Sequence, residues 1–231
     1  MKCNIVELRQ YALHPGRRDG LIDLFDREFI EAQEVTGMAV LGQFRDLDRP
    51  DHFVWLRGFE DMPSRARALT DFYAGPAWKA HAAQANATMI DVDDVLLLRP
   101  AAQHTGFLDA MAGRPSPGHS VPPSSALILA TIYHRDYPYD EAFLDLFCGD
   151  VLPVLRSMGT APLACLQTEY AENNFPALPV RSGVNAFVWL ARFESTEHIE
   201  LWLQRVRSSQ IGRSGNEQHL RLSPTGRSML R

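Results

Sequence analysis

Apolar and polar residues alternate from Ile5 to Leu13, which is typical of a β-strand with one buried face. Leu21, Phe25 and Phe29 then recur at the spacing of one helix face, so we expect a helix over residues 19–35. The same patterns predict the remaining elements of the first hundred residues, which are strands over 39–44, 53–59 and 94–99 and a helical stretch over 61–87 that breaks at Gly75-Pro76.

A repeat is visible in the pattern. The motif FVWLRGFE at residues 53–60 returns as FVWLARFE at residues 187–194, at an offset of 134 residues. Nearer the start, Tyr11 matches Tyr133 at an offset of 122 residues. The offsets differ by 12 residues, which an insert within Glu172 to Asn185 of the second copy explains, so the matches indicate two copies of one structural unit in tandem.

The second copy predicts the same order of elements, with strands over 126–134, 163–170, 185–193 and 219–222 and helices over 140–157 and 196–209. Pro153 should kink the first of these helices, and Ser195 should cap the second. We therefore divide the chain into a first repeat (1–100), a Pro/Gly-rich linker (101–125) and a second repeat (126–231).

Each copy has the order β-α-β-β-α-β, which is a ferredoxin-like unit with helices on one face of its sheet. The other face must be buried, and two copies in one chain can bury these faces against each other. We predict an α+β fold in which tandem ferredoxin-like repeats form an intramolecular α/β barrel. The extra residues of the second copy, Asn173 to Gly183, should form a loop over one end of this barrel.

Composition narrows the class of protein. With 45% apolar residues, 22% charged residues and a net charge of −5, the chain is globular and lacks a basic surface for nucleic acid or membrane. Its three cysteines have no disulfide or zinc spacing, so we expect buried, reduced thiols. The chain shows neither a signal peptide nor an apolar span, which predicts a cytoplasmic protein, and its near lack of lysine suggests a bacterial genome.

The candidate chemistry lies on two strands of the first repeat, where alternation groups Glu7, Arg9 and Tyr11 on one face and Phe53, Trp55, Arg57 and Phe59 on another. The ferredoxin-like order makes these strands neighbours, so we expect one charged, aromatic inner face.

The second repeat has Leu129, Thr131 and Ala191 where the first has Glu7, Arg9 and Arg57. Two interpretations stay open. The charges pair with one another as a purely structural cluster, or the first repeat holds a polar site.

Several stretches of the first repeat resemble the NIPSNAP family: Glu7-Leu8-Arg9-Gln10-Tyr11, Pro15-Gly16, Gly37-Met38, Val54-Trp55-Leu56-Arg57-Gly58-Phe59, Asp61, Arg67, Phe72-Tyr73 and Trp78. The resemblance implies a dimeric α/β barrel. That superfamily includes cofactor-free monooxygenases, isomerases and cyclases as well as haem-handling enzymes. A fold shared this widely does not name one reaction.

We expect a cofactor-independent enzyme that acts on a small planar or carbonyl-bearing organic molecule. Arg9 and Arg57 would anchor a ligand oxygen, Tyr11 would donate a hydrogen bond or proton, and Glu7 would orient them or act as a base. The predicted substrate-binding aromatic residues are Trp55, Trp78, Tyr73 and Phe53.

Two alternatives differ in class. The chain is a non-catalytic ligand-binding or interaction protein, or it is a haem enzyme with His81 as axial ligand, because the resemblance implies a helical histidine beside an aromatic residue. No metal-ligand, phosphate-loop or serine-nucleophile motif occurs in the sequence. A homodimer of chains is also expected.

Overall fold

Eight strands close into one barrel in the order β1-β3-β2-β8-β5-β7-β6-β4. The computed structural model describes residues 3–107, 113–117, 125–206 and 216–231. The strands are β1 Ile5–Leu13, β2 Ala39–Asp46, β3 His52–Phe59, β4 Met89–Pro100, β5 Leu127–Arg135, β6 Pro162–Thr168, β7 Asn185–Phe193 and β8 Glu217–Pro224.

The two halves of the chain contribute to the barrel in the same way. The first half gives the order β4-β1-β3-β2 and the second gives β8-β5-β7-β6. The halves meet through two antiparallel pairs, β2 with β8 and β4 with β6. The structure therefore has the mixed α/β barrel that the sequence predicts.

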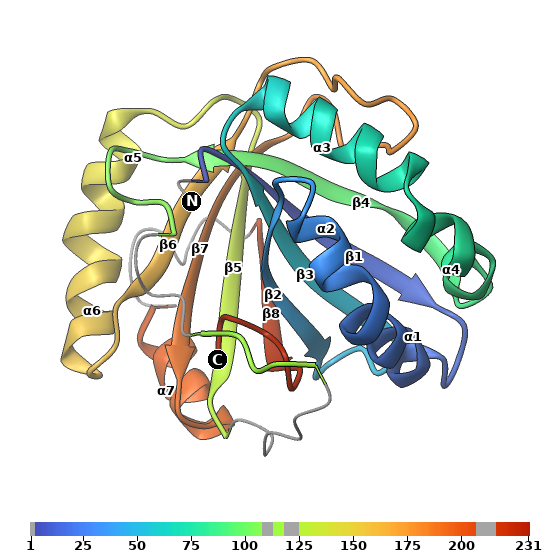
Figure 1. The fold of residues 1–231 in the computed structure, drawn as a ribbon. Coiled ribbons are helices and arrows are strands. Elements are labelled where there is room, and N and C mark those ends of the chain that lie inside the picture. Colours follow the sequence, from blue (N-terminus) through green and yellow to red (C-terminus); the bar gives the residue numbers. More distant parts are fainter. Residues whose placement is uncertain (1–2, 108–112, 118–124, 207–215) are drawn as a thin grey trace.

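Helices cover the outside of the barrel. They are α1 Arg18–Leu24, η1 Phe25–Phe29, α2 Ile30–Glu34, α3 Met62–Ala74 and α4 Pro76–Asn86 in the first half, and α5 Glu141–Leu146, η2 Phe147–Val151, α6 Leu152–Ser157 and α7 Thr196–Val206 in the second. Figure 1 shows the first set on one side of the barrel and the second set on the other.

The long helix predicted in each half contains a π-helical turn. The turns η1 and η2 lie at matching places, 122 residues apart. Pro153 lies in the first turn of α6, directly after η2. Ser195 accepts a hydrogen bond from the His198 amide at 3.3 Å, as expected of a cap for α7. The predicted end of that helix, beyond Val206, lies outside the described residues.

The barrel interior is apolar. Val6 and Leu8 of β1 pack there with residues of both halves, among them Ile128 and Val188. The opposite face of β1, which carries Glu7, Arg9 and Tyr11, packs against the helices of the first half. Our expectation of a charged inner face is therefore wrong. A closed barrel joins the two halves through their uncharged faces, where a charge would have no partner.

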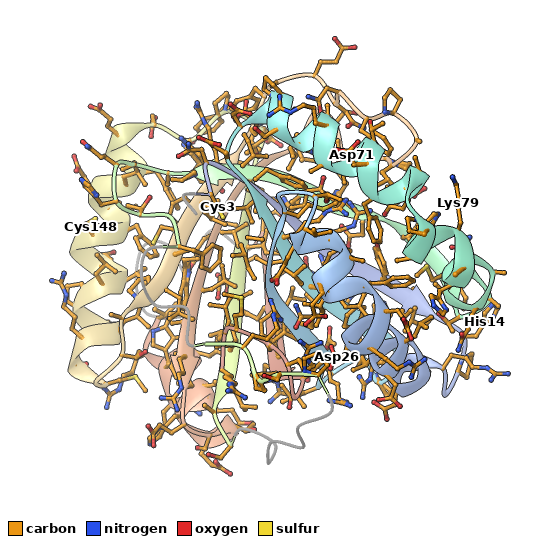
Figure 2. The ribbon with its side chains drawn as sticks, viewed as in Figure 1. Cys3, His14, Asp26, Asp71, Lys79 and Cys148 are labelled. Atoms are coloured by element: carbon orange, nitrogen blue, oxygen red, sulfur yellow. The ribbon has the colours of Figure 1, made fainter. Side chains whose placement is uncertain are left out.

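One smaller expectation also needs correction. Cys3 and Cys165 are buried, but Cys148 is exposed on the outer side of its helix (Figure 2). β4 ends at Pro100 and β5 begins at Leu127, but residues 108–112 and 118–124 of the linker lie outside the described residues, so the domain boundaries remain a prediction. None of the described helices has the length and apolarity needed to cross a membrane.

Candidate functional site

The pairing of β1 with β3 brings the predicted residues together. Glu7 lies opposite Arg57, Arg9 opposite Trp55, and Tyr11 opposite Phe53. Side chains at directly opposed positions share one face of the sheet. The neighbourhood predicted from strand alternation is thus confirmed, although it lies on the helix side of the sheet.

Glu7 is the centre of a buried ionic cluster. Its Oε2 lies 2.6 Å from Arg9 Nη1 and 2.8 Å from Arg57 Nε, and its Oε1 lies 2.7 Å from Arg65 Nε. All four side chains are 0% exposed. One buried carboxylate therefore pairs with three guanidinium groups, all of them out of contact with water.

Arg65 was missed by the sequence reasoning, which noted its exposed neighbour Arg67 instead. Arg65 lies on α3 with Ala68, Leu69 and Phe72 on the buried face of that helix. Helical spacing alone could have found it, because an arginine three and four residues before apolar positions shares their face. Its Nη1 donates to the Oδ1 atoms of two asparagines in the second half.

The cluster fixes its own charge state. Burial alone would raise the pKa of Glu7, but the nearby Arg57, Arg9 and Arg65 outweigh burial and hold that pKa well below its ordinary value. Burial lowers the pKa of Arg65, and the two other arginines add to that effect. Glu7 thus stays ionised at neutral pH and is poorly suited to act as a base there.

A cavity of about 100 Å³ lies beside the cluster, between the sheet and the helices of the first half. Its lining is mostly aromatic and apolar, and consists of Tyr11, Leu21, Phe25, Phe29, Gln33, Trp55, Phe72, Tyr73, Trp78, Asn86, Met89, Val92 and Leu178. Such a lining suits a planar organic ligand.

The predicted site residues divide into two groups. Tyr11, Trp55, Tyr73 and Trp78 line the cavity, whereas Glu7, Arg9, Arg57 and Phe53 are not part of its lining. Phe53 packs behind the wall, with its ring centroid 6.5 Å from that of Tyr11 and 5.5 Å from that of Phe25.

Two side chains connect the cluster to the cavity. Arg9 Nε donates to the Tyr11 hydroxyl oxygen at 2.9 Å. Arg57 Nη1 donates to Gln33 Oε1 at 3.4 Å. The arginines therefore connect to the cavity through Tyr11 and Gln33, and do not line it themselves as the sequence suggested.

The second half of the chain completes the site. Leu178, from the insert, lines the cavity, and Phe175 stacks on Tyr73 with ring centroids 5.8 Å apart. Asn173 and Asn174 accept hydrogen bonds from Arg65. The insert therefore packs against the helix layer of the first half, beside α3 (Figure 1).

His81 does not fit the role of a haem ligand in this arrangement. It lies on α4 outside the cavity lining, with its Nε2 3.4 Å from Glu28 Oε2. The cavity is also smaller than the ~300–1,000 Å³ of pockets for larger ligands. Within the described part of the chain, no group of three or more His, Cys, Asp and Glu side chains is arranged to hold a metal ion.

Comparison with solved structures supports the fold. Two crystal structures of proteins proposed to be monooxygenases match nearly the whole chain. The protein from Lactobacillus acidophilus is 12% identical, with a TM-score of 0.54 and coverage of 96% of this chain and 94% of its own. The protein from Fusobacterium nucleatum is 10% identical, with a TM-score of 0.55 and coverage of 97% and 94%.

A third match covers only part of the chain. An uncharacterized NIPSNAP-like domain protein from Burkholderia xenovorans is 26% identical, with a TM-score of 0.40, and covers 51% of this chain and 95% of its own. No curated protein sequence gives a significant match.

The sequence profile of the NIPSNAP family matches residues 6–103. These residues contain β1 to β4, the ionic cluster and most of the cavity lining, so the family match covers the half of the barrel that holds the candidate site.

Proposed function

We propose that this protein is a cofactor-independent enzyme that acts on a small planar, carbonyl- or hydroxyl-bearing organic molecule in the cavity of its first half. The observation that carries the proposal is Tyr11, which lines an aromatic cavity and whose hydroxyl accepts a hydrogen bond from buried Arg9. A hydroxyl held in this way can donate to a ligand oxygen and stabilise negative charge that develops there.

Each residue has a separate role in this proposal. Tyr11 is the catalytic residue, because it is the one member of the predicted set Glu7, Arg9, Tyr11 and Arg57 that lines the cavity, and its hydroxyl is bonded to Arg9 of the cluster. Arg9 positions and polarises Tyr11, and Glu7 holds the arginines in place. Trp55, Tyr73 and Trp78 hold the ring of the ligand.

Stabilising charge on a carbonyl oxygen favours enolisation, in which the proton beside the carbonyl leaves to water; this is a step of isomerase and cyclase chemistry. Molecular oxygen, the co-reactant of a monooxygenase, can then take two electrons from the enolate and form a carbon–oxygen bond as a hydroperoxide, which loses water to give the oxidised product. The names of the two full-length structural neighbours support oxygen chemistry, although at 10–12% identity their likeness extends to the fold only.

The test uses a panel of single-ring ketones and phenols with two assays in parallel. Deuterium incorporation beside the carbonyl, followed by NMR in D₂O, reports enolisation, and an oxygen electrode reports oxidation. We expect turnover of at least one compound and a loss of roughly tenfold or more in Tyr11→Phe. Tyr133→Phe, at the equivalent position of the second half, should keep the full rate.

Thermal-shift measurements on the same panel separate the alternatives. If a compound binds in a Tyr11-dependent way but is not turned over, the result would support the alternative of a non-catalytic ligand-binding protein. If no compound binds, the cavity is not a ligand site and the proposal is wrong.

A further inference from the structure

The buried cluster carries more positive than negative charge. Three guanidinium groups face one carboxylate, and all four side chains are 0% exposed. Within the described residues, Glu7 is the ion-pair partner of each arginine, and no second carboxylate joins them. Removing a charge from water without a counter-charge costs several kcal/mol, so the cluster favours a further anion nearby.

Cation–π contacts offset part of this excess. The Arg9 guanidinium lies 5.4 Å from the ring centroid of Tyr11, and that of Arg57 lies 5.1 Å from the ring centroid of Trp55. Two terminal nitrogens, Arg9 Nη2 and Arg65 Nη2, are nevertheless buried without a hydrogen-bond acceptor among the described residues. Donors left without an acceptor in this way are unfavourable, which strengthens the case for an anionic ligand.

The route from the cluster to the cavity passes through Tyr11. The Tyr11 oxygen accepts from Arg9, so its hydroxyl proton is available to a group in the cavity. The amide nitrogen of Gln33 already donates to the Phe29 carbonyl at 3.2 Å. Among the donors of the lining, the Tyr11 hydroxyl is the one that accepts a hydrogen bond from an arginine of the cluster, which favours an anion with its charge on one oxygen at that point.

The size of the cavity limits the ligand. At about 100 Å³ it is comparable with the ~150 Å³ cavity that takes up one benzene ring. At the wall, the ring centroids of Trp78 and Tyr73 lie 4.8 Å apart, and those of Phe29 and Trp78 lie 5.6 Å apart. These observations favour a single aromatic or enolic ring.

We propose that the first-half cavity binds a single-ring phenol or enol as its oxyanion, with the charged oxygen on the Tyr11 hydroxyl and the ring among Trp55, Tyr73 and Trp78. This inference rests on the proposed function and assigns the ionisation state of its ligand. The phenol or enol proton leaves to solvent on binding. Arg9 acts through Tyr11 as a positioning residue.

The charges around Tyr11 stay constant near neutral pH, so a titration reports the ligand. The titratable groups that face Tyr11 are Arg9 on the same strand, Glu7 and Arg57 in the cluster, and Tyr73 on α3. Burial raises the pKa of Tyr73, which keeps that phenol neutral, and the arginines keep Glu7 ionised.

The probes are 4-nitrophenol, whose phenolate is yellow and whose neutral form is nearly colourless, and nitrobenzene, which lacks the hydroxyl group. Absorbance is recorded against pH with the intact protein in excess. We expect the pKa of bound 4-nitrophenol to fall by at least one unit, which is a preference of tenfold or more for the phenolate. Nitrobenzene should bind more weakly and serves as the measure of ring binding alone.

Variants at two equivalent tyrosines assign the effect. Tyr11→Phe should reduce the phenolate preference by roughly tenfold, because it removes a hydrogen bond to a charged oxygen. It should leave nitrobenzene affinity nearly unchanged. Tyr133→Phe should change neither measurement. The comparison of the two probes on the unmodified protein needs no variant, so it holds even if Tyr11→Phe does not fold.

The possible failures are distinguishable. If both probes bind equally and the pKa of 4-nitrophenol does not fall, the cavity takes rings but the oxyanion inference is wrong. If the phenolate preference survives in folded Tyr11→Phe, the anion lies elsewhere and this inference is also wrong. If neither probe binds, the proposed function fails with it.

Discussion

The two halves of the barrel share one backbone plan and differ in what fills the layer between sheet and helices. Glu7 pairs with Arg57 as Leu129 pairs with Ala191, and both halves carry a π-helical turn at the same place. Counting along equivalent elements, the five polar positions of the first half and their counterparts are Glu7 and Leu129, Arg9 and Thr131, Gln33 and Leu155, Arg57 and Ala191, and Arg65 and Ile199. The same fold therefore forms without the charges.

The difference extends to the space that remains. The seventh residue after the N-cap is Ala68 on α3 and Trp202 on α7. Trp202 is fully buried, and its ring centroid lies 4.8 Å from that of Trp189. A large ring fills the layer of the second half, whereas the first half keeps a small residue at this position and a cavity nearby. Packing and charge thus both distinguish the candidate site from the equivalent layer of the second half.

The largest expected effect comes from removing the one carboxylate of the cluster. Glu7→Gln should lower the free energy of unfolding by about 3–5 kcal/mol, because it leaves three buried guanidinium groups without a counter-charge. Urea unfolding measures the change. Glu60→Gln, at an exposed position one residue beyond β3, is the control and should stay within about 0.5 kcal/mol of the unmodified protein. Equal effects of the two substitutions would contradict the assigned cluster.

Trp202 gives the next test, because it fills the space that the first half leaves open. Trp202→Ala should lower the free energy of unfolding by about 3–5 kcal/mol, since it creates a cavity in a packed layer. Trp78→Ala should cost less than about 2 kcal/mol, because Trp78 is only half-buried and already borders a cavity. The two losses are compared by urea unfolding, and the opposite order would overturn the contrast between a filled and an open half.

A third test converts the first half toward the second. The combined substitution Glu7→Leu, Arg9→Met, Arg57→Met and Arg65→Met removes all charges of the cluster and keeps similar volumes. We expect a stability within about 2 kcal/mol of the unmodified protein, because well-packed apolar residues often replace a buried ionic cluster without loss. Binding of 4-nitrophenolate, measured by the same absorbance titration, should disappear. A folded protein that still prefers the phenolate would show that the cluster has no part in the site.

Sequence patterns predict the frame of this fold well. β1 and β7 match their predicted bounds, because β1 carries an alternating pattern and β7 is an apolar run, Ala186 to Ala191, of strand length. β4 begins at Met89, five residues before the predicted Asp94, because its first half is largely exposed and mixes acidic with apolar residues. The local sequence pattern therefore predicts strands wherever at least one face is buried, and fails to predict them where both faces are exposed to solvent.

The candidate site shows where sequence reasoning stops. Alternation groups Glu7, Arg9 and Tyr11 on one face, but both faces of β1 are buried, so the pattern cannot say which one meets the helices. Arg65 was missed because an arginine on a helix usually marks the solvent side. The contact of Asn173 with Arg65 joins residues 108 apart and depends on barrel closure, which no local signal encodes.

The smallest expected effect concerns pH and the helix that covers the cavity. Burial raises the pKa of Asp26 on η1 to about 6 from its ordinary 3.8, although Arg227 and Arg114 partly oppose it. Its Oδ1 is buried without a hydrogen-bond partner among the described residues. The equivalent residue of the second half is Cys148, which is exposed. Figure 2 shows Cys148 at the left edge of the molecule and Asp26 on the helix of the first half, near the lower middle of the view.

Because the folded state holds the Asp26 proton more tightly than the unfolded state, the free energy of unfolding falls as pH rises from about 4 to about 6. The full rise of the pKa would correspond to about 3 kcal/mol, and partial exposure of the residue reduces this to about 1–2 kcal/mol. Asp26→Asn should therefore be more stable than the unmodified protein by that amount at pH 7–8 and equally stable near pH 4. Thermal unfolding across this range measures it, with Cys148→Ser as the pH-independent control. A constant difference between Asp26→Asn and the unmodified protein at all pH values would mean that Asp26 does not titrate in this range.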